Sequence, residues 1–172
     1  MIGVMNLEYA QERPVSVARV LIVDDFELWK DFVIGRLKEQ PDFSIVGIAS
    51  DGLQAVQRAE ELQPDLILLD MFLPKLNGIE AARQIRKLAP KSKILFVSGE
   101  SASELVRTSF RVGGRGYVWK MHAGTDLLAG MEAVLKGRQF VSPSLADLRD
   151  VTDAKGSEFE DETSASGTDS TS

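Results

Sequence analysis

Short apolar runs alternate with amphipathic stretches along this chain, and the two patterns repeat five times. Four of the runs are continuously apolar, which is typical of strands that are buried on both faces of a parallel sheet. Parallel strands need crossover connections, and helices between the runs would supply them. The pattern therefore predicts a doubly wound α/β fold. The predicted strands cover residues 20–23, 44–49, 66–69, 94–97 and 116–119.

Capping residues and prolines mark the ends of the predicted helices. The first helix should run over residues 27–39, and the second should follow Asp51 and end before Pro64. Asn77 and Ser101 are predicted to begin the next two helices, because a glutamate follows each of them three residues later, as in a capping box. The fourth helix has a thin apolar face, so we expect it to be the most mobile. The residues expected on the buried face of the second helix are Leu53, Val56, Ala59 and Leu62.

The composition allows one hydrophobic core with flanking segments. The chain has 172 residues, of which 44% are hydrophobic, and this is material for one domain of ordinary size. We expect a polar leader over residues 1–17, a folded domain over residues 18–142, and a linker with an acidic disordered segment over residues 143–172. The sequence contains no cysteine, signal-peptide pattern or apolar run of membrane-spanning length. We therefore expect a cytoplasmic protein that does not bind a membrane.

The net charge of -6 comes entirely from the last residues of the sequence. Residues 1–149 contain 19 basic and 19 acidic side chains, whereas residues 150–172 contain one basic and seven acidic side chains. This acidic segment is rich in Ser, Thr and Gly and has little apolar surface to bury, so disorder is predicted. Its charge opposes nonspecific binding to phosphates, and we expect no nucleic-acid partner.

Polar residues follow four of the predicted strands, at Asp24 and Asp25, Asp70, Ser98, and Lys120. Ligands of open α/β sheets bind beyond the carboxyl ends of the strands, so these side chains should converge at one edge of the sheet. Three carboxylates, a hydroxyl and an ammonium would then lie together. Such a group is typical of a phosphorylation site.

Several motifs in this chain resemble, in the same order, those of a bacterial response-regulator receiver domain. The matching pieces are LIVDD at 21–25, DMFLP at 70–74, NGIE at 77–80, VSG at 97–99, GYVWK at 116–120 and GRQFVSP at 137–143. The resemblance covers residues 18–142 and is closest to the NarL/FixJ type. It implies a flavodoxin-like (βα)5 sheet with strand order 2-1-3-4-5.

The resemblance implies a role for each residue of the predicted site. Asp70 is the expected phosphoacceptor, with Ser98 and Lys120 binding the phosphoryl oxygens. Because an anionic nucleophile is repelled by an anionic donor, the reaction also needs a metal cation, and Mg²⁺ is expected. The expected metal ligands are Asp24, Asp25, Asp70 and the backbone carbonyl of Phe72.

Two further pairs of residues receive a role from the resemblance. Ser98 and Tyr117 are the expected switch, in which the serine moves toward the phosphoryl group and the tyrosine ring fills the vacated space. A core tyrosine is the alternative interpretation. Phe26 and Trp29 follow the acidic pair and are interpreted as a docking patch for the kinase, with packing of the first helix as the alternative for Trp29. His122 is expected to be neither a phosphodonor nor a metal ligand.

These features predict a single-domain response regulator of two-component signalling. It would accept a phosphoryl group from a histidine kinase or phosphotransfer protein and signal by contact with a downstream protein, with homodimerisation on phosphorylation as an option. We do not expect an enzyme, beyond catalysis of its own phosphorylation and dephosphorylation. NarL/FixJ regulators usually continue into a helix-turn-helix domain, which we do not expect from the acidic residues after 143. The alternative is therefore a transcription regulator that lacks its DNA-binding domain or is truncated before it.

Other functions fit the sequence less well. A haloacid-dehalogenase-like phosphatase needs a second aspartate two residues after the nucleophile, where this chain has Phe72. A Rossmann or P-loop nucleotide site needs a glycine-rich turn after the first strand, and none follows Asp25. A receiver-like scaffold that is never phosphorylated stays open, although Asp70 and Lys120 argue against it.

Overall fold

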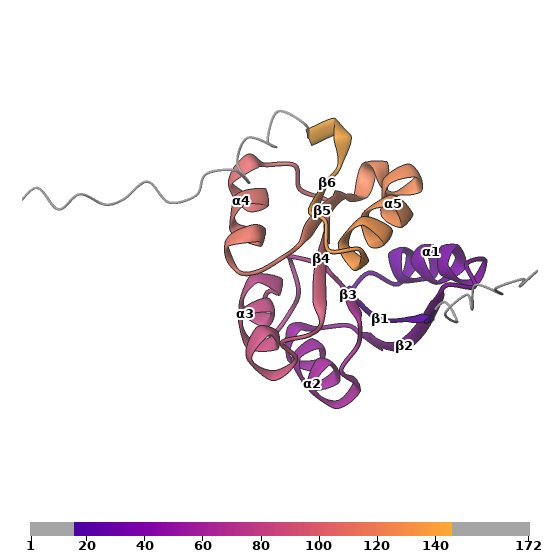
Figure 1. Cartoon of the computed structure of the whole chain (residues 1–172). Helices are drawn as coiled ribbons and strands as arrows, with labels where there is room; N and C mark the ends of the chain where they lie inside the picture. Colours follow the sequence, from indigo (N-terminus) through magenta and orange to yellow (C-terminus); the bar gives the residue numbers. More distant parts are fainter. Residues whose placement is uncertain (1–15, 146–172) are drawn as a thin grey trace, which may run out of the picture.

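A sheet of six parallel strands forms the centre of the molecule (Figure 1). The computed structural model describes residues 16–145, so the predicted leader up to residue 15 and the acidic segment lie outside the described residues. The strand order β2-β1-β3-β4-β5-β6 confirms the predicted flavodoxin-like order and adds a sixth strand. The strands are β1 (Ala18–Val23), β2 (Phe43–Ala49), β3 (Leu66–Leu69), β4 (Lys93–Ser98), β5 (Gly116–Trp119) and β6 (Phe140–Val141).

Helices cover both faces of the sheet, which explains why the middle residues of the central strands are apolar (Figure 1). One hydrophobic cluster lies between the sheet and α1 and α5, and it includes Val33 and Leu127. The other lies under α2, α3 and α4 and includes Ala59, Ile85 and Val106. Among the described residues, no helix has the length and apolar character needed to cross a bilayer. The helices are α1 (Glu27–Lys38), α2 (Gly52–Leu62), α3 (Gly78–Leu88), α4 (Ser103–Arg111) and α5 (Ala123–Leu135), with a short 3-10 helix, η1 (Lys120–His122), before α5.

Side-chain caps fix the start of α2 and α3. The carboxylate of Asp51 accepts a hydrogen bond from the Gln54 N–H at 2.8 Å, and this bond is the main reason why the pKa of Asp51 lies below its usual value. Asn77 accepts from the Glu80 N–H at 2.9 Å, so the predicted start of α3 is confirmed. Both caps satisfy backbone donors that would otherwise lack a partner.

The predicted start of α4 at Ser101 is wrong, because the helix begins at Ser103 without a side-chain cap. The preceding loop is held by side chains of β5. The Tyr117 hydroxyl donates to the Glu100 carbonyl at 2.7 Å, and the Trp119 indole N–H donates to the Gly99 carbonyl at 3.1 Å. These tertiary hydrogen bonds hold residues 99 and 100 in the loop, and the predicted cap at Ser101 is not formed.

The prediction for the buried face of α2 is wrong at Leu53, whereas Ala59 is buried and Val56 and Leu62 pack against the core as predicted. Leu53 is exposed, whereas Ala55 and Ala59 are fully buried. At the start of this helix, a Cβ on Gly52 would lie 1.8 Å from the Leu76 carbonyl oxygen, so the backbone approaches the loop before α3 very closely. A small residue therefore makes this close approach, and of the larger apolar side chains of α2 only Leu53 is exposed.

The sixth strand, β6, was not predicted, because only two residues form it. It pairs with β5 and places Phe140 opposite Gly116. Ser142, which follows β6 and is fully buried, is bonded to β5 twice. Its N–H donates to the Tyr117 carbonyl, and its Oγ accepts from the Trp119 N–H, both at 2.9 Å. The predicted exit from the last helix is therefore part of the sheet.

Candidate functional site

The carboxylates that the sequence predicted to converge meet at one edge of the sheet. The register pairs Val23 of β1 with Leu69 of β3, so the next residues, Asp24 and Asp70, lie side by side. The Asp70 N–H donates to the Val23 carbonyl at 3.0 Å and continues the pairing beyond the strand end. Carboxylate oxygens of Asp24, Asp25 and Asp70 all lie within 4.8 Å of one another. This spacing allows one divalent cation to contact all three.

Lys120 reaches the carboxylates from the end of β5. Its Nζ lies 2.6 Å from Oδ2 of Asp24 and 3.5 Å from Oδ2 of Asp70. The ring of Trp29 on α1 lies 5.0 Å from the same Nζ, measured to the ring centroid, which is a cation–π distance. Trp29, which is predicted to dock the kinase, therefore also contacts the Lys120 ammonium, and the sequence did not predict this contact.

Burial and a neighbouring carboxylate raise the pKa of Asp70. Burial, and after it the charge of Asp24, raise the pKa of the Asp70 carboxyl from 3.8 to about 6. Lys120 and the N–H groups of Met71 and Phe72 act in the opposite direction, and the Met71 N–H donates to Oδ1 at 2.8 Å. Negative charge thus exceeds positive charge at this point. Three oxygen ligands in such surroundings fit Mg²⁺, which binds carboxylates and waters.

A tight loop after β3 fixes the orientation of Asp70. The Gly78 N–H donates to the Met71 carbonyl at 2.8 Å, and a Cβ on Gly78 would lie 2.1 Å from the Asp70 carbonyl oxygen. Within the loop, Lys75 has a φ of 66° and its Nζ lies 3.2 Å from Oδ2 of Asp51. Gly78 is part of the NGIE motif, but no role was predicted for it. Its spacing from Asp70 along the sequence was the available signal.

Ser98 and Tyr117 lie on the neighbouring strands β4 and β5. Ser98 is fully buried at the end of β4, and its Oγ accepts from the Glu100 N–H at 3.2 Å. The ring of Tyr117 is fully buried, its hydroxyl donates to the Glu100 carbonyl, and burial raises its pKa. The loop before α4 is therefore hydrogen-bonded to both predicted switch residues.

Large apolar side chains border the carboxylate cluster in sequence and remain exposed. Phe26 follows Asp25 and is 58% exposed, and Phe72, two residues after Asp70, is 56% exposed. Met121 follows Lys120 and is 75% exposed, yet sequence reasoning did not select it. On α1, Trp29 packs against the ring of Phe32, with 5.1 Å between the ring centroids.

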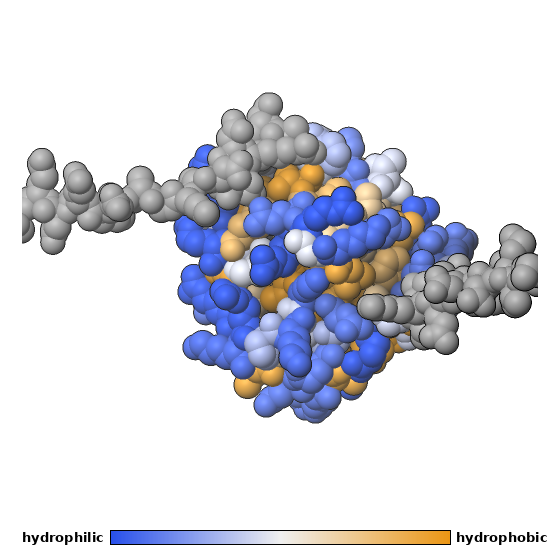
Figure 2. All heavy atoms as spheres, in the orientation of Figure 1, coloured by the Kyte–Doolittle hydropathy of each residue, from blue (hydrophilic) through white to orange (hydrophobic). Residues whose placement is uncertain are grey.

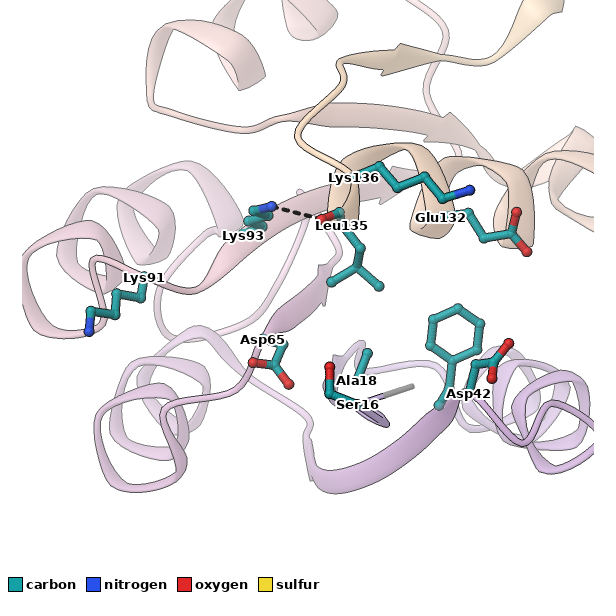
Figure 3. A pocket seen from close by; sticks show the side chains of 10 residues that line it. Ser16, Ala18, Asp42, Asp65, Lys91, Lys93, Glu132, Leu135 and Lys136 are labelled. Atoms are coloured by element: carbon teal, nitrogen blue, oxygen red, sulfur yellow. Dashed lines mark hydrogen bonds between the residues drawn. The ribbon is translucent and has the colours of Figure 1, made fainter. Parts of the chain in front are cut away.

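A cavity of about 570 Å³ lies at the opposite edge of the sheet (Figure 3). It is lined by residues at or before the starts of strands, such as Ala18, Asp65 and Lys93, and by none of the predicted site residues. Lys93 donates to the Leu135 carbonyl at 3.0 Å within it. His122 is remote from this cavity too, and its ring stacks on Trp119 with 5.1 Å between centroids.

Comparisons with known proteins agree with this geometry. A family model described as the response regulator receiver domain matches residues 20–132. The nitrate/nitrite response regulator protein NarL of Escherichia coli is 34% identical over 128 residues, which make up 74% of this chain and 59% of NarL. The protein-glutamate methylesterase/protein-glutamine glutaminase of Thermotoga maritima is 39% identical over 113 residues, which make up 64% of this chain and 33% of that enzyme.

A solved structure shows the same likeness. The two-component response regulator of the LuxR family from Aurantimonas sp. SI85-9A1 superposes with a TM-score of 0.75 at 30% identity, and the match covers 81% of this chain and all of that one. The chain spans less than two thirds of the length of the two curated relatives. Since the family model matches more than half of the sequence and the fold and acidic cluster agree with it, this chain belongs to the response regulator receiver domain family of two-component signalling, with NarL among its relatives.

Proposed function

We propose that Asp70 accepts a phosphoryl group from a histidine kinase or a histidine-containing phosphotransfer protein, and that the phosphorylated chain signals by contact with another protein. The observation that carries this proposal is the position of Lys120, whose ammonium lies against both Asp24 and Asp70. An ammonium in this place can bind the oxygens of a phosphoryl group attached to Asp70.

The two carboxylate oxygens of Asp70 have different surroundings, and this difference selects the nucleophile. Oδ1 accepts a hydrogen bond from the Met71 N–H, whereas Oδ2 faces Lys120. Oδ2 is therefore the oxygen that attacks phosphorus. An O–P bond to Asp70 forms while the N–P bond to the donor histidine breaks, and the residues around it contribute position and charge.

Asp24, Asp25, Asp70 and the backbone carbonyl of Phe72 would hold Mg²⁺. When bound, this cation supplies positive charge to the transferred phosphoryl oxygens. The Phe26 N–H donates to Oδ1 of Asp24 at 2.9 Å, which fixes the orientation of that carboxylate in advance. The proposed reaction is the phosphorylation and dephosphorylation of the chain itself, without a second substrate to be turned over.

Ser98 and Tyr117 would connect the site to α4. Both are hydrogen-bonded to Glu100, three residues before the helix begins. If Ser98 turns toward a phosphoryl group, its hydrogen bond from the Glu100 N–H is lost and the loop before α4 must rearrange. This is a two-state element that a local charge can bias.

Phe26 and Trp29 would contribute to a docking surface for the phosphodonor protein, because they lie beside the site and Phe26 is exposed. Exposed aromatic side chains of this kind are enriched in protein interfaces. A chain without cysteine suits the reducing cytoplasm, where such a donor would meet it. The downstream partner, or a second copy recruited on phosphorylation, would read the surface that α4 presents.

Incubation with acetyl phosphate and Mg²⁺ tests the assignment of Asp70. Intact-mass measurement should show one added phosphoryl group in the wild type and none in Asp70→Asn, since an amide is not a nucleophile. Asp42→Asn is the matched control, because Asp42 is an exposed carboxylate at the opposite edge of the sheet. Its phosphorylation should equal that of the wild type. An adduct that persists in Asp70→Asn, or that forms after EDTA treatment, would contradict the assignment.

A further inference from the structure

Two shallow hollows on the side of α3 and α4 are lined by basic side chains. One, of about 450 Å³, lies between the end of α3 and the loop before β5, and the other, of about 400 Å³, lies between α3 and the end of α4. Arg86 lines both, so the two hollows form one continuous surface, called here the basic groove. Among the described residues, no acidic side chain lines either hollow. The basic side chains that line the basic groove are Arg83, Arg86, Lys87, Lys91, Lys93, Arg111 and Arg115.

Most of this positive charge has no acidic partner within the described part of the chain. Arg83 pairs with Glu80 at 2.9 Å, and Arg111 approaches Glu104 at 3.7 Å. The other five basic side chains of the groove form no ion pair with a residue between 16 and 145. Figure 2 shows hydrophilic side chains gathered over the α3 and α4 side of this face. An unbalanced cluster of cations in a concave surface attracts an acidic ligand.

The glycine at position 113 leaves space for the side chain of Arg86. At Gly113, which has a φ of +100°, a Cβ would lie 2.3 Å from Cδ of Arg86. A glycine here both accepts the left-handed backbone and leaves room for the arginine side chain to lie along the surface. The guanidinium is thereby offered to the groove.

The neighbouring cavity at the amino-terminal edge of the sheet has a different character (Figure 3). Asp42, Asp65 and Glu132 line it together with lysines, so its charges are mixed and give an acidic ligand little net attraction. Lys91 borders both surfaces, and in the close-up its side chain extends away from the three carboxylates. An acidic ligand therefore has one favoured surface on this side of the molecule.

We propose that the acidic residues 150–172 of the same chain bind in the basic groove. Residues 81–116 contain eight basic and two acidic side chains, a net charge of +6, and residues 150–172 have one basic and seven acidic side chains, a net charge of -6. The charges of the two segments match in size and are opposite in sign. Carboxylate–arginine pairs are weak singly at an exposed surface, but several act together here.

The covalent connection favours binding within one chain. The described residues end at Leu145, five residues before the acidic segment. A domain of this size has a radius of gyration of about 14 Å, and an extended chain spans about 3.3 Å per residue, so the segment reaches any face of the domain. Charge, and not reach, therefore selects the groove. A tethered ligand also has an effective concentration on the order of millimolar, which compensates for weak individual contacts.

Paramagnetic relaxation enhancement in the full chain tests this proposal. The wild type has no cysteine, so Ser157→Cys accepts a single nitroxide label in the acidic segment. We expect loss of amide signal at Gly113, Gly114 and Arg111 and not on α2. The signals should return in about 0.5 M NaCl, where the Debye length falls to about 4 Å. They should also return in the double variant Arg86→Ser, Arg111→Ser.

The matched control is Lys38→Ser, Arg58→Ser, which removes the same charge from exposed positions on α1 and α2, and it should leave the signal loss unchanged. Signal loss that is absent, spread evenly over all faces, or insensitive to salt overturns the proposal. Signal loss in a mixture of isotope-labelled chain and spin-labelled unlabelled chain would assign the segment to a second copy. Groove amides that respond to an added oligonucleotide and not to the segment would assign the groove to nucleic acid.

Discussion

Replacing Asp70 with asparagine should make the metal-free protein more stable at neutral pH. The folded-state pKa of this carboxyl is about 6, against 3.8 ordinarily, because burial and the charge of Asp24 disfavour its ionised form. A difference of about two pKa units corresponds to about 3 kcal/mol of destabilisation once Asp70 is ionised in both the folded and unfolded states. The amide is neutral and still accepts the Met71 N–H, so Asp70→Asn avoids this cost.

The sign of the effect depends on pH in a defined window. A raised carboxyl pKa means that the folded state binds the proton more tightly, so its contribution to stability is complete below about pH 4 and is lost as pH rises to about 6. We therefore expect Asp70→Asn to gain about 2–3 kcal/mol over the wild type at about pH 7.5 and almost nothing at about pH 4. Added Mg²⁺ should narrow the difference, because it binds the folded wild type and stabilises it.

Urea unfolding followed by circular dichroism measures the difference directly. With a slope of about 1–3 kcal/mol per molar urea, the midpoint of Asp70→Asn should rise by about 1 M or more at neutral pH with EDTA present. Asp42→Asn, at an exposed position, should not move the midpoint. The reasoning is refuted if Asp70→Asn is no more stable than the wild type under these conditions, or if its advantage is the same at about pH 4.

Three other substitutions have defined outcomes. Phe72→Asn should let water approach the phosphorylated Asp70 and should orient it by a hydrogen bond. Decay of radiolabelled phosphoprotein should therefore accelerate by about tenfold, a barrier change of about 1.4 kcal/mol. Equal or slower decay would show that the Phe72 ring does not keep water from the site. Gly78→Ala should lower the free energy of unfolding by about 1–3 kcal/mol, because its Cβ would collide with the Asp70 carbonyl, whereas Gly35→Ala, with open space around it, is the control that should not destabilise. Tyr117→Phe removes the hydroxyl that holds the loop before α4 and should cost about 0.5–1.5 kcal/mol in urea unfolding; an unchanged midpoint would mean that this hydrogen bond contributes nothing to stability.

The apolar runs predicted a parallel sheet and the convergence of Asp24, Asp25, Asp70 and Lys120, because residues that follow such runs lie at one edge of the sheet. The order of the strands was implied by the resemblance to receiver domains. It did not predict features that depend on tertiary contacts. The start of α4 was misplaced, and the loop before it is held by Tyr117 and Trp119, which lie more than fifteen residues further along the chain than the carbonyls they bind. Likewise β6 has only two residues, too few for any periodic pattern.

The contact of Trp29 with Lys120 joins residues from opposite ends of the domain, and it could not be predicted from spacing. The sequence gives the residue types, but the contact between the Trp29 indole and the Lys120 ammonium depends on the fold. A similar limit applies to Asp70, whose raised pKa depends on burial and on the distance to Asp24. Sequence alone therefore indicates the chemistry of the site but not the protonation of its central residue.

The two hydrogen bonds of Ser142 give the domain a mechanical property. They bind β5 on both sides of Val118, at the Tyr117 carbonyl and at the Trp119 N–H. If β5 moves, Ser142 must move with it or lose these hydrogen bonds. The last described residues, 142–145, are therefore coupled to the strand that holds Tyr117, which ends at the same edge of the sheet as the carboxylate cluster.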